Sequence, residues 1–304
     1  MHLRNVEIFC EVVSRRSFSK AAEVHHVSQS AASQAVHHLE KRLGVQLIDR
    51  SKRPFELTAA GQIYYDGCRD LLDGFRRIED QAREAENLVA GRVCVASIYS
   101  VGLLQMDAYV KRFQIQYPEA ELQLEYLHPD EVYERILNDA ADLGLVSFPR
   151  DGGEIGSIPW QNQDLVLVVP KSHPLAGQES IQPGQIDGEK FVGFTTELTL
   201  RRRIDRWLRR TRVAVDVVHE FDNVETIKRA VEIGAGISLL PEPTVLRERD
   251  AKTLAVVRLD ISQAERDDGE WIRPLGIVHK RHKAFSSAAQ RFIDLLKSDI
   301  PAAV

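Results

Sequence analysis

A sustained apolar repeat between residues 59 and 89 divides this chain into two unequal parts. No proline occurs between Pro54 and Pro118, and from residue 64 onward apolar side chains recur at alternating intervals of four and three residues. That spacing aligns one narrow stripe along a long helix, as in a coiled-coil seam. The stripe consists of Tyr64, Cys68, Leu71, Phe75, Ile78, Ala82, Ala85 and Val89. Such a helix could pack on its own domain, but its place between two segments favours pairing with a second copy. We therefore expect a homodimer formed through a linker helix at residues 59–90.

The segment before this helix, residues 1–58, has the pattern of three short helices and a hairpin. Ser17 and Ser28 are placed to cap the second and third helices, and Gly44 can end the third in the left-handed conformation. The spacing of the first helix buries Val6, Phe9, Cys10 and Val13, and that of the second buries Phe18, Ala21 and Ala22.

The third predicted helix has two contrasting faces. The inner face carries Ala32, Val36, Leu39 and Leu43. The outer face carries Ser30, Gln34, His37 and Lys41, with Gln29, Ser33 and His38 at its flanks. Neutral hydrogen-bonding groups with almost no carboxylate suit a helix that enters the major groove and contacts base edges. A merely polar surface helix would present a similar face, so this helix alone does not decide between the two interpretations.

The segment after the third helix reads as two short strands around a basic, proline-containing turn between Leu47 and Thr58. Arg50, Lys52 and Arg53 at the tip could reach phosphates or the minor groove. Three helices and a basic hairpin together predict a winged helix-turn-helix. The candidate DNA-contacting residues are Ser28, Gln29, Ser30, Ser33, Gln34, His37, Lys41, Arg50, Lys52, Arg53 and Thr58.

The charge distribution agrees with this division. The whole chain of 304 residues carries a formal charge of −5, which by itself argues against a nucleic-acid partner. Residues 1–58 hold nine basic and six acidic side chains and so carry +3, which leaves −8 on the remainder. A basic head on an acidic body is the asymmetry expected of a DNA-binding domain joined to another module.

Several runs in the head resemble the LysR-type transcriptional regulators. They are Phe18-Ser19-Lys20-Ala21-Ala22-Glu23, Val27-Ser28-Gln29-Ser30-Ala31-Ala32-Ser33-Gln34, Leu43-Gly44-Val45-Gln46-Leu47-Ile48-Asp49-Arg50 and Leu57-Thr58-Ala59-Ala60-Gly61. Ser30 stands where the family commonly has Pro, and Gln34 where it commonly has Arg. The resemblance implies double-stranded promoter DNA as partner, a dimer through the linker helix, a homotetramer, and RNA polymerase as a further partner. It leaves open whether the protein is an activator or a repressor.

Residues 91–304 alternate strand and helix patterns, which predicts α/β structure with a mostly parallel sheet. Strands are expected at 93–96, 121–127, 143–146, 164–169, 191–194, 213–218, 237–240 and 272–279. Helices are expected before Tyr117 and at 131–139, 200–210, 224–233 and 284–296. By resemblance these elements form a periplasmic-binding-protein-like (type 2) effector domain. Its lobe I would comprise 91–163 and 267–304, and its lobe II 164–266. The matching runs are Tyr117-Pro118, Ala141–Leu145, Leu165–Pro170, His173–Leu175 and Gly234–Pro241.

A ligand cleft is expected beyond the carboxyl ends of the strands, where helix N-termini attract anions. Hydroxyl side chains follow two of these strands, and Phe148 could form a wall. Each hydroxyl could equally be a simple helix cap. The candidate effector-binding residues are Ser97, Ser100, Phe148, Thr195, Thr196, Thr199 and Arg201, and the ligand would be a small, anionic metabolite.

Other functional classes find no support in the sequence. Cys10, Cys68 and Cys94 are odd in number and far apart, which argues against a disulfide framework or a metal cluster. No catalytic constellation or phosphate loop is present, no apolar run is long enough to span a membrane, and no cofactor is expected. We expect a cytoplasmic regulator. The competing hypothesis, a cytoplasmic solute-binding or catalytic protein with a helical head, leaves the polar helix, the basic hairpin and the heptad stripe unexplained.

Overall fold

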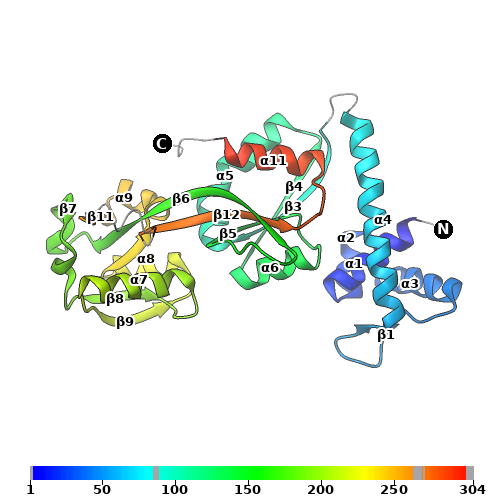
Figure 1. Ribbon diagram of the computed structural model, residues 1–304, viewed down its shortest axis with the longest axis horizontal. Coiled ribbons are helices and arrows are strands. Elements are labelled where there is room, and N and C mark those ends of the chain that lie inside the picture. Colours follow the sequence, from blue (N-terminus) through cyan, green and yellow to red (C-terminus); the bar gives the residue numbers. More distant parts are fainter. Residues whose placement is uncertain (1–2, 85–88, 263–268, 270, 299–304) are drawn as a thin grey trace.

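The computed structural model describes residues 3–84, 89–262, 269 and 271–298. A helical head, a long helix and a two-lobed α/β body follow one another along the chain, and the long helix crosses the head and extends beyond it (Figure 1). In the described residues, no helix is long and apolar enough to cross a membrane.

The head is the predicted winged helix-turn-helix. Its elements are α1 (Leu3–Arg15), α2 (Phe18–Val24), α3 (Gln29–Leu43), β1 (Ile48–Asp49) and β2 (Glu56–Leu57). The predicted caps are confirmed, because Ser17 Oγ accepts a hydrogen bond from the Lys20 amide and Ser28 Oγ accepts one from the Ala31 amide. Gly44 adopts a left-handed φ of 69° and ends α3. The core predicted for α3 is buried except for Leu43, which is 39% exposed.

The linker helix α4 (Ala59–Glu84) begins directly after the hairpin. Tyr65, Cys68 and Leu72 on its first half are buried in the core of the head. The second half continues past α1, α2 and α3, as Figure 1 shows. Head and linker helix therefore share one hydrophobic core over the first half of α4.

Lobe I combines the first part of the body with the end of the chain. Its elements are β3 (Gly91–Ile98), α5 (Tyr99–Gln116), β4 (Ala120–Leu127), α6 (Pro129–Leu137), β5 (Leu143–Ser147), β12 (Ile272–Lys280) and α11 (Ser287–Lys297). Strands β4, β3 and β5 are parallel neighbours, whereas β12 pairs with β5 in the antiparallel direction. Phe113, Ile136 and Phe292 bury the helices against this sheet.

Lobe II has its own core, in which the rings of Trp207 and Trp271 lie 4.5 Å apart. Its strands are β7 (Ser180–Ile181), β8 (Lys190–Phe194), β9 (Asp216–Phe221), β10 (Ser238–Pro241) and β11 (Leu254–Leu259). Its α-helices are α7 (Thr199–Thr211), α8 (Val224–Glu232) and α9 (Leu246–Asp250). Short 3-10 helices occur at Pro174–Gly177, Pro183–Ile186 and Glu242–Thr244.

One long strand, β6 (Ile155–Pro170), joins the two lobes. Its first half pairs with β12, for example Ile158 with Ile277, and its second half pairs with β10 and β11 on either side of Val168. The prediction of a strand at 164–169 captured only the second half. The expectation of a mostly parallel sheet holds for β3, β4 and β5 and for β8 and β9, but every β6 and β12 pairing is antiparallel.

Candidate DNA-binding and effector sites

The outer face of α3 is exposed as the sequence predicted. Its exposed members are Gln29, Ser30, Gln34, His37, His38 and Lys41, with Ser33 half-buried between them. Ser28 caps the helix, and its hydroxyl also lies 2.8 Å from the Ser30 hydroxyl. Because Ala32, Val36 and Leu39 are buried on the other side, the helix is fixed in one rotation relative to the head. A helix held in this way presents amide, hydroxyl and imidazole groups outward, as base-edge readout requires.

The wing is held to α3 by one buried carboxylate. Glu40 is 6% exposed, and its Oε1 accepts hydrogen bonds from the amides of Leu47 (3.0 Å) and Ile48 (3.2 Å). Its Oε2 lies 3.2 Å from Nη2 of Arg50, whose guanidinium also lies 5.9 Å from the ring centre of Phe18. Arg50 is therefore anchored while part of it stays exposed, which restricts where it can reach a phosphate. Lys52 pairs with Glu56, and Arg53 is exposed at the tip.

We expect Glu40→Gln to destabilise the head by about 1–3 kcal/mol, since the amide keeps the shape but leaves Arg50 without its anionic partner. Chemical denaturation of the full chain measures this change. Glu56→Gln is the control, because it removes a carboxylate from an exposed pair of the same hairpin and should change stability by less than about 1 kcal/mol. Equal losses in both variants would contradict the anchoring role of Glu40.

Thr58 takes a role different from the predicted DNA contact. Its hydroxyl donates to the Gln46 carbonyl at 2.7 Å and accepts from the Gly61 amide at 2.9 Å. It therefore caps α4 and ties that helix to the end of the hairpin. The structure therefore gives Thr58 a structural role where the sequence predicted a DNA contact.

The predicted dimer seam divides into a covered and an exposed part. Cys68 is buried and Tyr64 packs against the head, where its hydroxyl accepts a hydrogen bond from Arg42. Leu71, Phe75 and Ile78 are 48%, 42% and 66% exposed. Ala82 is exposed, Val89 is half-buried against lobe I, and Ala85 lies outside the described residues. The exposed stripe thus begins where the head ends.

A cavity of about 260 Å³ lies between the two lobes. Ser100, Tyr133 and Phe148 line it from lobe I, and Thr199 and Arg202 line it from lobe II. The guanidinium of Arg203 lies 4.6 Å from the ring centre of Phe148, so the aromatic wall also contacts α7. The volume of the cavity is slightly under the usual range for ligand sites and suits a small metabolite.

The cavity contains a buried cation that the sequence reasoning missed. Arg273, the second residue of β12, is 4% exposed and lines the cavity. Its Nη2 donates to Ser100 Oγ at 2.6 Å and its Nη1 to Gln163 Oε1 at 3.4 Å, whereas its Nε has no hydrogen-bond partner among the described residues. Burial lowers the pKa of Arg273 to about 10, so the guanidinium stays charged at neutral pH. An arginine inside a predicted apolar strand was the available signal, because arginine is almost never buried unless it is paired.

Four predicted effector residues lie elsewhere. Ser97 is fully buried within β3 and donates to the Ile98 carbonyl at 3.2 Å. Arg201 is buried too, and its guanidinium pairs with Asp205 and Glu220, so it neutralises protein carboxylates. Thr195 and Thr196 precede α7 but do not line the cavity. The predictions for Ser97 and Arg201 were wrong, because the Ser97 side chain is buried within the lobe and the Arg201 guanidinium already pairs with Asp205 and Glu220. Ser100, Phe148 and Thr199 do line the cavity.

Sequence profiles of two domains match this chain. The profile of the bacterial regulatory helix-turn-helix protein, lysR family, matches residues 3–62, and that of the LysR substrate binding domain matches residues 86–300. The chain belongs to the LysR family of transcriptional regulators. This LysR regulator is thus a DNA-binding protein with an effector-binding domain and not an enzyme. The match to the helix-turn-helix profile excludes a solute-binding or catalytic protein with an unrelated helical head.

Individual relatives match this chain over most of its length or over its regulatory domain. An uncharacterized HTH-type transcriptional regulator of Escherichia coli K12, YeiE, is 29% identical over 96% of both chains. Full-length OxyR from Pseudomonas aeruginosa has the same fold, with a TM-score of 0.72 and 21% identity over 98% of this chain and 93% of that one. The regulatory domain of Synechocystis CcmR, solved in complex with 2-PG, is 26% identical over 70% of this chain and all of that one, with a TM-score of 0.60.

Proposed function

We propose that this LysR regulator senses a small metabolite carrying a carboxylate or phosphate group, and that Arg273 binds that group. The observation that carries the proposal is the buried guanidinium of Arg273 at the interlobe cavity, whose Nε has no hydrogen-bond partner among the described residues. The acidic side chains at the cavity, Asp130, Glu197 and Asp222, are all exposed and therefore screened by water, whereas Arg273 is not. An anion bound in the cavity would neutralise this buried charge.

The Synechocystis relative supports this ligand class, since its regulatory domain was solved with 2-PG. Residues of both lobes line the cavity, so a ligand that contacts both lobes favours one arrangement of them over the other. No cofactor is part of the proposal, and the described residues contain no cluster of His, Cys, Asp and Glu suited to a metal ion.

Thermal unfolding of the full chain tests the ligand class. A panel of small carboxylates and phosphates, including 2-PG, should contain at least one anion that raises the unfolding temperature of the wild type, and Arg273→Met should abolish that shift. The matching neutral alcohol or amide should have no effect. Equal stabilisation by the neutral analogue, or an undiminished shift in Arg273→Met, would contradict the proposal.

We further propose that the molecule binds promoter DNA as a homodimer through the exposed stripe of α4, and that two dimers form a homotetramer that communicates with RNA polymerase. Exposed Leu71, Phe75 and Ile78 support the dimer, because large apolar side chains in one stripe favour a protein partner. The tetramer and the polymerase contact follow from the family. Effector binding would then change the bend and spacing of the DNA bound by the two dimers.

The α3 face and the wing should contribute differently to DNA binding. Gln29→Ala or Ser33→Ala should reduce discrimination between operator and random DNA by about 10-fold, because these side chains reach base edges. Arg53→Ala should weaken binding to operator DNA and to random DNA by a similar factor, and should make the affinity less dependent on salt concentration. Fluorescence anisotropy on the fragment upstream of the protein's own gene measures both. Identical behaviour of the three variants on random DNA and operator would contradict these roles.

A further inference from the structure

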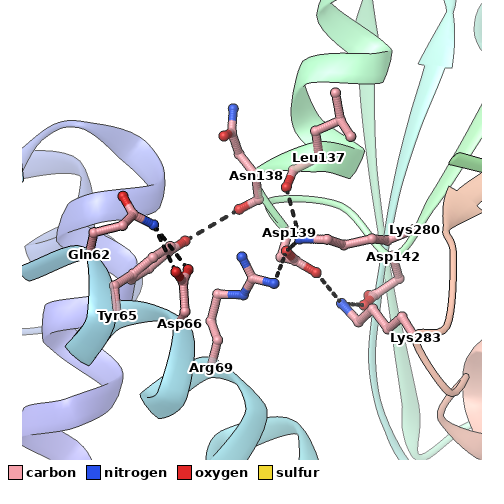
Figure 2. Close-up of polar contacts among 10 residues, drawn as sticks. All are labelled: Gln62, Tyr65, Asp66, Arg69, Leu137, Asn138, Asp139, Asp142, Lys280 and Lys283. Carbon is pink, nitrogen blue, oxygen red and sulfur yellow. Dashed lines mark hydrogen bonds and ion pairs between the residues drawn. The ribbon is translucent and has the colours of Figure 1, made fainter. Parts of the chain in front are cut away.

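One carboxylate joins the linker helix to lobe I. Nη2 of Arg69 on α4 lies 2.5 Å from Oδ2 of Asp139, whose side chain is only 8% exposed. Two lysines of lobe I share the same carboxylate: Nζ of Lys280 lies 2.7 Å from Oδ2, and Nζ of Lys283 lies 3.4 Å from Oδ1 (Figure 2). Asp139 is thus the point where cations from both sides of the interface meet.

On the head side, this contact starts from a rigid segment. Arg69 follows Cys68, which is buried in the core of the head together with Tyr65 and Leu72. The Arg69 guanidinium lies 5.4 Å from the ring centre of Tyr65, whose hydroxyl donates to the Asn138 carbonyl at 3.5 Å. Because this part of α4 shares the core of the head, a displacement of Arg69 displaces the head with it.

On the body side, α6 runs from the effector cavity to Asp139. Asp130, in the first turn of α6, lines the cavity. The turn after the helix is bonded back onto it, since the Asp139 amide donates to the Ile136 carbonyl at 3.1 Å and the Ala140 amide to the Arg135 carbonyl at 2.8 Å. Helix and turn therefore move together, and Asp139 follows any shift of the cavity wall.

Strand β12 makes the same connection by a second route. It carries Arg273 at the cavity and ends at Lys280, whose Nζ binds Asp139 and also donates to the Leu137 carbonyl at 3.1 Å. Arg273 and Lys280 are seven residues apart on this strand, a length of about 23 Å. Two elements that begin at the cavity thus end at one carboxylate, and that carboxylate binds the helix of the head.

We propose that Asp139 is the junction through which the effector cavity acts on the DNA-binding head, with the Arg69–Asp139 ion pair as the link between the two. This proposal rests on the proposed function, because the cavity must be the place where the signal begins. A shift of lobe I against lobe II moves α6 and β12, and the ion pair passes that shift to α4 and hence to the orientation of α3. The coupling travels through packed, hydrogen-bonded elements and the one short turn that carries Asp139.

Arg69 is the residue to change, because its loss leaves the pairing within lobe I intact. In Arg69→Gln, Asp139 retains both Lys280 and Lys283. Substituting Asp139 would instead leave three cations facing one another. Arg15→Gln is the matched control: it removes one positive charge from the head, where Arg15 pairs with Glu11 on the same helix.

A double-mutant cycle on DNA affinity tests the coupling without any effector. Full-length wild type, Arg69→Gln, Arg273→Met and the double variant are titrated by anisotropy against the fragment upstream of the gene. Substitutions at independent, distant sites multiply to within about twofold. We expect the double variant to depart from the product by about threefold or more. We also expect the cycle built on Arg69→Lys, which keeps a cation beside Asp139, to obey the product within about twofold, as the Arg15→Gln cycle should.

The junction is overturned if the Arg69→Gln and Arg273→Met substitutions multiply within twofold, or if the Arg15→Gln cycle departs as much. Asp130→Asn replaces Arg273→Met at the cavity if the latter does not fold, since the Asp130 side chain is 67% exposed and its cycle tests the α6 route. The two proposals fail separately. If no anion of the panel gives an Arg273-dependent shift in unfolding temperature, the proposed ligand class is wrong. If the variants still bind DNA and the effects of the two substitutions on affinity simply multiply, the proposed junction is wrong.

Discussion

Phe75→Asp should convert the protein to a monomer and lower its affinity for promoter DNA by about 100-fold or more. Phe75 is 42% exposed in the middle of the α4 stripe, between exposed Leu71 and Ile78. A carboxylate there would be buried against its counterpart in the second copy, where neither charge has a partner. Losing the dimer removes the second half-site contact, which supplies most of the affinity of a helix-turn-helix dimer.

Sedimentation velocity measures the mass and anisotropy measures the affinity. Ile63→Asp is the matched control: the same substitution at a 77% exposed position of the same helix, outside the stripe. It should leave the dimer intact. A dimeric Phe75→Asp protein, or equal dissociation by Ile63→Asp, would show that the stripe is not the dimer contact.

Arg273→Met should lower the affinity for the effector anion by about 100-fold while leaving the fold intact. Truncating one partner of a buried, hydrogen-bonded charge pair costs about 2–5 kcal/mol, which is consistent with this factor. Removing a buried cation that has no carboxylate partner among the described residues should keep or raise the unfolding temperature of the unliganded chain. A binding loss therefore would not reflect unfolding.

Isothermal titration with the stabilising anion of the panel, 2-PG first, measures the change. Arg202→Met is the matched control, because Arg202 also lines the cavity but is exposed and donates to Thr199. Its loss should cost only a few-fold in affinity. The assignment of Arg273 is wrong if both variants lose the same affinity, or if Arg202→Met loses more.

Local patterns predicted the head well because its structure is determined within short stretches of chain. The caps at Ser17 and Ser28, the end of α3 at Gly44 and the buried face of α3 follow from nearest-neighbour chemistry and helical spacing. The linker helix follows from its heptads, but its first apolar positions are covered by the head, which spacing alone does not reveal.

The body was predicted less completely where long-range pairing decides the structure. The first half of β6 contains Pro159 and Asn162 and becomes a strand by pairing with β12, over one hundred residues away. Strand β11 was missed, and it too pairs with β6. The errors at the cleft have the same origin. Arg201 is neutralised by Glu220 on β9, while Arg273 has only neutral partners within the part of the chain that the structure describes, and neither fact is visible in the local sequence.

The coupling between cavity and DNA is tested by measuring the affinity for promoter DNA with and without the anion that binds the cavity. Anisotropy titrations on the upstream fragment, repeated at saturating 2-PG or another stabilising anion, give the ratio of the two affinities. Measurement of the bend angle by gel mobility on permuted fragments complements them. We expect a change in affinity of about 5-fold or more, or a changed bend, in the wild type and neither change in Arg273→Met. Unchanged affinity and bend in a wild-type protein saturated with the anion would contradict this coupling.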